Sequence, residues 1–171
     1  MIKEYAPLKS FPLKMGSSFA RPVQVLPEHV KLSDPAINVM TDLNKVSLVS
    51  VRTRTSMDRA NAKMIRYGVR MLLVLDDNEQ LAGLLTATDV LGEKPMRFLQ
   101  NMGGTHAEIM VRDIMTTQRE LEVMKIDDVQ HAKVGQIVAS LKKANRQHAL
   151  VVAEGADGRQ TVCGLFSITQ I

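Results

Sequence analysis

The feature that most constrains this sequence is an internal repeat. Val39-Met40-Thr41 recurs as Ile114-Met115-Thr116, 75 residues further along the chain, and the alternating apolar run 46–51 recurs as 121–126 at the same offset. Helically spaced apolar residues then recur at an offset of 77. The matched positions are Met57, Ala60 and Met64 in the first copy and Val134, Ile137 and Leu141 in the second. Such a repeat constrains the architecture of the whole chain, so we identify it before we assign helices and strands.

The second half of each copy continues the match. Leu73-Val74-Leu75 corresponds to Leu150-Val151-Val152, and Gly83-Leu84-Leu85-Thr86 corresponds to Gly164-Leu165-Phe166-Ser167 at an offset of 81. The four extra residues fall in the turn-forming run 154–158, where true repeats accept insertions. Each copy therefore predicts strand, helix, strand, strand, helix, with the first copy's closing helix over about 88–102 and a kink or restart at Glu93-Lys94-Pro95.

Two such units should pack together, because one alone buries its sheet face poorly. We therefore predict an α/β (α+β) fold of two β-α-β-β-α repeats related by a pseudo-two-fold axis, at residues 37–104 and 105–171. Five of the six prolines precede residue 36, so residues 1–36 are predicted to form an extended N-terminal arm, lying on the body or partly mobile. The sequence stops at Ile171, where the second closing helix should begin, so we expect that helix to be truncated, disordered or supplied by a partner.

Composition narrows the class of protein. With 45% hydrophobic and 23% charged residues the chain is globular, and with 4% aromatic residues, no Trp and 11 Met it has an aliphatic core and little material for stacking on bases. The net charge of +4 comes from scattered Lys and Arg, which favours a solvated basic surface over nucleic-acid binding. One cysteine, no secretory signal and no apolar run of bilayer length predict a cytoplasmic location without membrane contact.

Catalytic and metal chemistry find little support in the sequence. No nucleophile, base and orienting group form a recognisable set, so the chain is not predicted to be an enzyme. Cys163 lies in an apolar strand and is predicted to be an inert thiol. Asp76-Asp77 and Asp127-Asp128 are predicted to lie in solvated loops. No metal site is predicted, because the histidines lack ligand spacing; they are His29, His106, His131 and His148.

The order of elements, the Met-Thr lead-in and the segment Gly83-Leu84-Leu85-Thr86-Ala87-Thr88-Asp89 resemble the CBS (cystathionine beta-synthase) domain. Two copies in tandem resemble a Bateman module, over about residues 37–171. The resemblance implies a cleft between the copies that binds adenosine compounds such as AMP, ADP, ATP or S-adenosylmethionine, with no required cofactor. It also implies a homodimer formed through the helices.

The same resemblance implies a set of ligand-binding residues. Thr86 and Thr88 offer hydroxyls beside a helix N-terminus for a phosphate, and Asp89 can accept hydrogen bonds from ribose hydroxyls. Thr-x-x-Asp is also an ordinary helix-capping pattern. In the second copy an amide replaces the carboxylate, which predicts a weaker second site. The predicted ligand-binding residues are Arg70, Thr86, Thr88, Asp89, Gln147, His148, Ser167 and Gln170.

Together these features predict a regulatory module that senses AMP, ADP or ATP and signals to an unidentified partner protein by conformational change. The alternative from a different class is a dimerisation or scaffold module whose cleft binds no ligand. A nucleic-acid binder driven by the basic excess is the third possibility, and it predicts a steep dependence of binding on salt.

Overall fold

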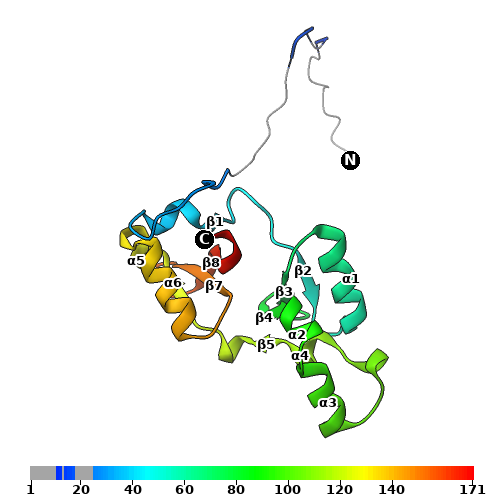
Figure 1. The fold of residues 1–171 in the computed structure, drawn as a ribbon. Coiled ribbons are helices and arrows are strands. Elements are labelled where there is room, and N and C mark those ends of the chain that lie inside the picture. The colour runs from blue at the N-terminus through cyan, green and yellow to red at the C-terminus, as the bar shows by residue number, and fades with distance from the viewer. Residues whose placement is uncertain (1–10, 13, 18–24) are drawn as a thin grey trace.

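The computed structural model describes residues 11–12, 14–17 and 25–171, in which two four-stranded sheets form two lobes (Figure 1). The rest of the predicted arm lies outside the described residues. The first sheet has the order β2 (Ser50–Arg52), β3 (Met71–Leu75), β4 (Leu81–Thr86) and β5 (Thr116–Thr117). The second has the order β1 (Thr41–Asp42), β8 (Gln160–Ser167), β7 (His148–Glu154) and β6 (Val123–Lys125). The predicted α+β class is confirmed.

Each lobe has its own helices. The first lobe carries α1 (Met57–Tyr67), α2 (Ala87–Leu91), α3 (Lys94–Met102) and α4 (Val111–Ile114), and the second carries α5 (Ile126–His131) and α6 (Val134–Lys143). Short 3-10 helices complete the elements: η1 (Ala36–Val39), η2 (His106–Glu108), η3 (Gln118–Glu120) and η4 (Ile168–Gln170). Within the described residues, no helix combines the length and apolarity that a membrane span requires.

The two repeats match in detail. The β2–α1–β3–β4 order of the first recurs as β6–α6–β7–β8, with α5 added between β6 and α6, and in both repeats the strand before the helix pairs parallel with the strand after it, β2 with β3 and β6 with β7. Both hairpins carry an irregularity at the same place, between Val74 and Leu75 and between Val151 and Val152. The predicted apolar faces of α1 and α6 are buried. The internal repeat is therefore a structural repeat.

Several local predictions need correction. The closing helix predicted over 88–102 does restart at the predicted place, but it forms two separate helices, α2 and α3, because the chain leaves helical geometry at Gly92 before Lys94 begins the next helix. Asp127 and Asp128 lie in the first turn of α5 and not in a loop, since carboxylates suit the positive end of a helix. Of the runs 46–51 and 121–126, only Ser50-Val51 and Val123–Lys125 lie in strands, and the strand registers match Ser50 with Val123, two residues earlier than the predicted offset of 75.

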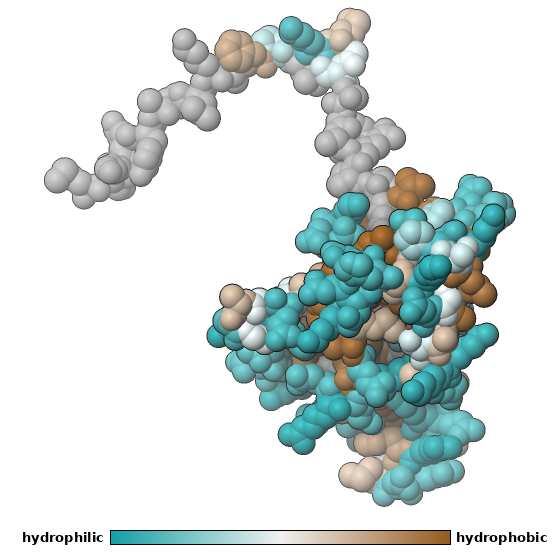
Figure 2. Space-filling view, turned by 90° about the vertical axis from the view of Figure 1, so that its left-hand side faces the viewer, coloured by the Kyte–Doolittle hydropathy of each residue, from teal (hydrophilic) through white to brown (hydrophobic). Residues whose placement is uncertain are grey.

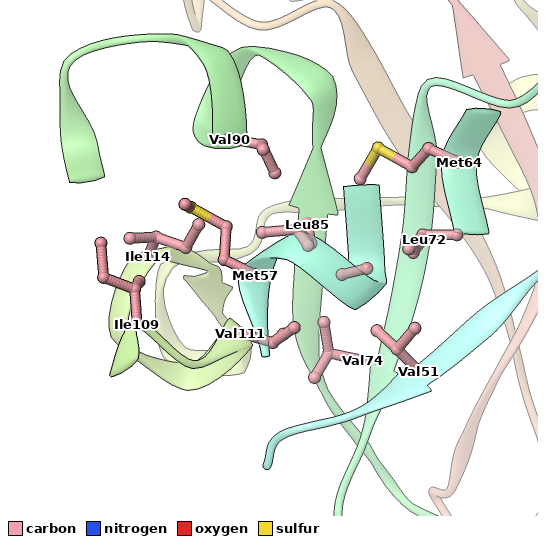
Figure 3. Close-up of a cluster of buried hydrophobic side chains, with 11 residues drawn as sticks. Val51, Met57, Met64, Leu72, Val74, Leu85, Val90, Ile109, Val111 and Ile114 are labelled. Carbon is pink, nitrogen blue, oxygen red and sulfur yellow. The ribbon is translucent and has the colours of Figure 1, made fainter. Parts of the chain in front are cut away.

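The sequence did not reveal that the repeats exchange their lead-in segments. β1 opens the first repeat but pairs with β8 of the second, and β5 opens the second repeat but pairs with β4 of the first. The short helices η1 and α4, which precede these strands, also pack in the opposite lobe. Val39 of η1 lies in the core of the second lobe, whereas Val111 and Ile114 of α4 lie in the core of the first (Figure 3). Each lobe is thus completed by the other repeat.

A third apolar cluster joins the lobes. Met71 of β3 and Leu84 of β4 pack with Leu150 of β7 and Leu165 of β8, so the two sheets meet through aliphatic side chains. On the face of the second lobe that Figure 2 presents, hydrophilic side chains cover most of the surface and apolar areas are small. The core is aliphatic, as the composition predicts, with Phe166 as the one aromatic residue among its fully buried large side chains.

Two equivalent glycines make room for the exchanged strands. A Cβ on Gly83 would lie 2.2 Å from the main-chain oxygen of Thr116 in β5. A Cβ on Gly164 would lie 2.4 Å from the sulfur of Met40, beside β1. The first obstacle is backbone held in a strand pair, and the second is a flexible side chain.

We expect these two glycines to differ in their tolerance of alanine. Gly83→Ala should lower the free energy of unfolding by about 3 kcal/mol, because β5 must move away from β4. Gly164→Ala should cost only about 1 kcal/mol, because the Met40 side chain can change rotamer. Urea unfolding followed by circular dichroism measures both. Equal losses would contradict the packing described for β5.

Candidate functional site

The main cleft of the molecule lies between the repeats and has a volume of about 500 Å³. One side is formed by the end of β4 and the start of α2, and the other by the end of α6 and the start of β7. Thr116 and the segment after it also line the cleft, because β5 pairs with β4. The lining residues are Leu84, Thr86, Thr88, Asp89, Thr116, Leu121, Glu122, Leu141, Lys142, Asn145, Arg146, Gln147, His148, Leu150 and Ile168.

Thr86 and Asp89 form a capping box at the start of α2. The Thr86 main-chain N–H and hydroxyl both donate to Asp89 Oδ2, at 2.8 Å each, and the Asp89 N–H donates to Thr86 Oγ1 at 3.2 Å. The capping function of the Thr-x-x-Asp pattern is therefore realised in the structure. Since Asp89 Oδ2 already accepts two hydrogen bonds, its other oxygen, Oδ1, offers the remaining capacity.

Asp89 Oδ1 is held by Lys94 at the start of α3. The Lys94 ammonium lies 2.7 Å from this oxygen and also donates to the Ile114 carbonyl at 3.1 Å. The Asp89 side chain is only 10% exposed, so this pair is screened less than a surface pair. Lys94 thereby ties the cleft both to α3 and to the lead-in that continues into Thr116.

Thr88 differs from Thr86. It is exposed, lines the cleft, and its hydroxyl makes no hydrogen bond within the described residues. It follows the N-cap by two positions, near the main-chain N–H groups that the first turn of a helix leaves without helical partners. Thr88 is therefore the hydroxyl of this corner that is available to an incoming group.

The second repeat presents a cationic and amide-rich segment to the same cleft. After α6 the chain reverses at Asn145, whose φ of 51° is in the left-handed region, and Gly68 occupies the matching position after α1 with φ of 63°. The turn brings Arg146, Gln147 and His148 to the cleft. The Arg146 guanidinium is anchored by a 2.6 Å hydrogen bond to the Glu120 carbonyl.

His148 is half-buried and faces charges from the first repeat. Burial, together with the nearby Arg70 guanidinium, lowers the pKa of His148 below its ordinary value, against an opposing effect of Asp89. His148 is therefore neutral at pH 7, and an anion in the cleft would favour its protonated form.

The structure brings five of the predicted site residues into the cleft: Thr86, Thr88, Asp89, Gln147 and His148. Arg70 is exposed and does not line it, although its charge acts on His148. Ser167 is buried, with its hydroxyl 2.9 Å from that of Thr169. Gln170 accepts a 3.2 Å hydrogen bond from the Thr41 hydroxyl, beside the other exchanged strand.

Other polar residues of the cleft were not predicted from the sequence; they are Thr116, Glu122, Lys142, Asn145 and Arg146. Thr116 belongs to the repeated Met-Thr pair, so the repeat singled out this residue. Its position in the cleft depends on the pairing of β5 with β4, which the repeat does not indicate. Arg146 is adjacent to two predicted residues and matches Val69 in the first repeat, so the repeat gave no signal for it.

The lining of the cleft carries groups that suit an anion. Lys142 and Arg146 supply positive charge and Thr88 supplies a hydroxyl, which are groups that bind phosphate. Within the described part of the chain, no cluster of at least three His, Cys, Asp or Glu side chains is arranged to hold a metal.

Comparisons with known proteins agree with this fold. The family described as the CBS domain matches residues 36–95. An uncharacterised conserved protein from Pyrococcus horikoshii is 22% identical, over 82% of this chain and 90% of that protein, with a TM-score of 0.57. CBSX2 in complex with AMP is 23% identical, over 80% and 92%, with a TM-score of 0.56; another CBSX2 structure names Arabidopsis thaliana as its source. No curated protein matches the sequence.

A further similar structure is the CBS-domain pair of MJ0100 in complex with 5′-methylthioadenosine and S-adenosylmethionine, at 14% identity, over 83% of this chain and 93% of that one, with a TM-score of 0.52. Two interlocked β-α-β-β repeats around a shared cleft define a CBS-domain pair. Residues 36–95 match the CBS-domain family, and the fold of the two repeats is that of a tandem CBS-domain pair, or Bateman module.

The environment of His148 predicts a dependence of stability on pH. Because the pKa of His148 is lowered in the folded state, the unfolded state binds the proton more readily. The contribution of neutral His148 is thus present above the unfolded pKa of 6.5 and is lost as pH falls below it. Between pH 7.5 and 5.5, the free energy of unfolding should fall more in the parent protein than in His148→Gln. Parallel urea titrations measure this difference, and identical pH profiles would contradict it.

Proposed function

We propose that the protein is a regulatory CBS pair that binds an adenosine nucleotide in the inter-repeat cleft and signals to a partner through a change in its helices. The observation that carries the proposal is one cavity lined by complementary groups from both repeats. Thr88 comes from the first repeat, whereas Arg146 and His148 come from the second. A ligand that bridges them would stabilise one angle between the lobes.

The chemistry of the cleft suits the parts of a nucleotide. Its volume of about 500 Å³ lies within the range of small-molecule sites. Aliphatic Leu84, Leu121 and Leu150 offer an apolar surface to a purine. Thr88 and Arg146 would bind phosphate, and Asp89 would accept hydrogen bonds from ribose hydroxyls. The AMP complex of CBSX2 and the 5′-methylthioadenosine and S-adenosylmethionine complex of MJ0100 support an adenosine ligand.

Lys94 offers a route for the signal. A ribose hydroxyl that donates to Asp89 Oδ1 would compete with the Lys94 ammonium, which holds that oxygen at 2.7 Å. Displacement of Lys94 would also weaken its hydrogen bond to the Ile114 carbonyl. Ligand binding would therefore loosen the start of α3. The proposed role is regulatory, because the groups that line the cleft suit the binding of phosphate and ribose.

The helices also carry apolar side chains suited to protein contacts. Ile65 of α1 is 74% exposed, Met96 of α3 is 60% exposed and Met102 of α3 is 74% exposed. Exposed apolar side chains on neighbouring helices support a homodimer and a contact with the regulated protein. A loosened α3 would change this surface, which would connect the nucleotide to the partner.

Titration calorimetry with AMP, ADP and ATP tests the proposed ligand. Thr88→Val keeps the shape of the side chain and removes only its hydroxyl, which makes no hydrogen bond within the described residues. It should weaken binding of the preferred nucleotide at least tenfold, since a hydrogen bond to a charged group contributes about 1.5 to 3 kcal/mol. Thr161→Val, on the exposed part of β8, is the matched control and should bind as the parent does.

If none of the three nucleotides binds or raises the melting temperature, the ligand proposal is wrong. The dimerisation or scaffold alternative would then account for the fold without a ligand.

Lys94→Gln tests the route of the signal. Without the competing ammonium, AMP should bind several-fold more tightly, and amide exchange over residues 94–102 should be fast before AMP is added. In the parent protein AMP should accelerate this exchange. Arg97→Gln removes an exposed ion pair with Glu93 on the same helix and should leave the AMP effect unchanged. Unchanged exchange in the parent upon AMP binding would exclude this route.

A further inference from the structure

A second cavity, of about 450 Å³, lies at the free edge of the first sheet. It is bounded by β2, the first half of α1 and the turn between β3 and β4. Its charged lining consists of Arg52, Arg59, Lys63 and Glu79, so three cations face one carboxylate. No residue of this edge cavity lines the inter-repeat cleft.

The cations of the edge cavity retain unused hydrogen-bond donors. Arg52 is engaged with the Asp76 carbonyl and with Glu79, and it holds the β3–β4 turn. The Lys63 ammonium donates to the Ser50 carbonyl at 2.6 Å, which leaves two of its N–H groups. The Arg59 guanidinium makes no hydrogen bond or ion pair within the described residues.

Main-chain and hydroxyl donors add to this set. The Val49 carbonyl and the Thr53 N–H bond to β3, so the N–H of Arg52, one residue before Thr53, points away from β3 at the free edge. The Ser50 carbonyl, which accepts from Lys63, points to the same edge. Thr55 contributes a hydroxyl that makes no hydrogen bond within residues 25–171.

The second repeat shows that the fold itself does not require the two cations of α1. The positions that match Arg59 and Lys63 hold Gln136 and Ser140, whereas the strand registers match Arg52 with Lys125, which is also a cation. Arg59 is also placed in the first turn of an 11-residue helix, where the helix dipole disfavours a cation. An anion in the edge cavity would offset this cost.

We propose that the edge cavity binds a compact small-molecule anion carrying adjacent phosphate groups, of the pyrophosphate class. Arg59 and Lys63 lie four residues apart on one face of α1, so both can contact neighbouring phosphates. The Thr55 hydroxyl and the Arg52 N–H supply neutral donors to the same group. A cavity between a strand and a helix encloses a small molecule, whereas a nucleic acid needs an extended charged surface. This site is independent of the proposed adenosine ligand.

Titration of the full chain with inorganic pyrophosphate, at constant ionic strength, tests the site. Arg59→Gln should weaken binding about tenfold, because it removes a charge-assisted contact. It should not affect folding, because the replaced guanidinium has no partner in the described residues. Arg59→Gln/Lys63→Gln should abolish binding. Arg66→Gln/Lys143→Gln removes the same charge from exposed positions outside the edge cavity and should bind pyrophosphate as the parent does.

A titration in saturating AMP shows where pyrophosphate binds. If pyrophosphate binds in the edge cavity, its affinity should be the same for the AMP-saturated protein, because AMP is proposed to occupy the inter-repeat cleft. Displacement by AMP, together with normal binding to Arg59→Gln, would assign pyrophosphate to the inter-repeat cleft and overturn the proposal. If both double variants lost pyrophosphate affinity equally, binding would reflect the general charge of the protein, and this result would also overturn the proposal. No binding at millimolar pyrophosphate, or binding only of an oligonucleotide, would exclude a small-anion site.

Discussion

The exchange of lead-in segments is the constraint on which the rest of the structure depends. β1 completes the sheet of the second repeat and β5 completes that of the first, so neither sheet reaches four strands from its own repeat. The apolar side chains of η1 and α4 accompany these strands into the opposite cores. At Gly83 the arrangement requires a residue without a side chain, because the backbone of the exchanged strand β5 lies against it, whereas at the equivalent Gly164 the flexible Met40 side chain fills the space. These glycines are thus structural first, even though they lie beside the cleft.

The exchange also creates the cleft. Because β5 lies against β4, Thr116 is brought beside Thr86 and Thr88, and the chain that follows β5 forms part of the wall. The polar groups are nevertheless unequally distributed. The turn after α6 presents Arg146-Gln147-His148, whereas the matching turn after α1 has Val69-Arg70-Met71, with an apolar residue on each side of its arginine. The two turns therefore have similar backbones, but their side chains make the turn after α6 far more suitable for a phosphate than the turn after α1.

The elements that follow from local sequence could be predicted, and those that depend on distant segments could not. The buried faces of α1 and α6 follow from the spacing of Met57, Ala60 and Met64 and of their counterparts. Five predicted residues meet in the cleft because they lie at strand ends that the repeat marks. The pairing of Thr116 with Leu84 was not predictable, since two-residue strands carry almost no periodicity. The contact of Lys94 with Asp89 was missed for a related reason, because it depends on how α3 restarts after Gly92.

The edge cavity touches α1, and the chain just after α1 acts on the inter-repeat cleft through charge. α1 carries Arg59 in its first turn and ends at Tyr67; Arg70 follows three residues later, outside the cleft lining, and its guanidinium acts on His148 in the cleft. An 11-residue helix is about 16 Å long and moves as one body, so an anion that pulls the start of α1 toward β2 would also shift its end. Any such shift would be limited by Met57 and Met64, which are fixed in the core of the first lobe (Figure 3). An anion that moved α1 would therefore have to rotate the first lobe as a whole, against the aliphatic contact that joins the two sheets.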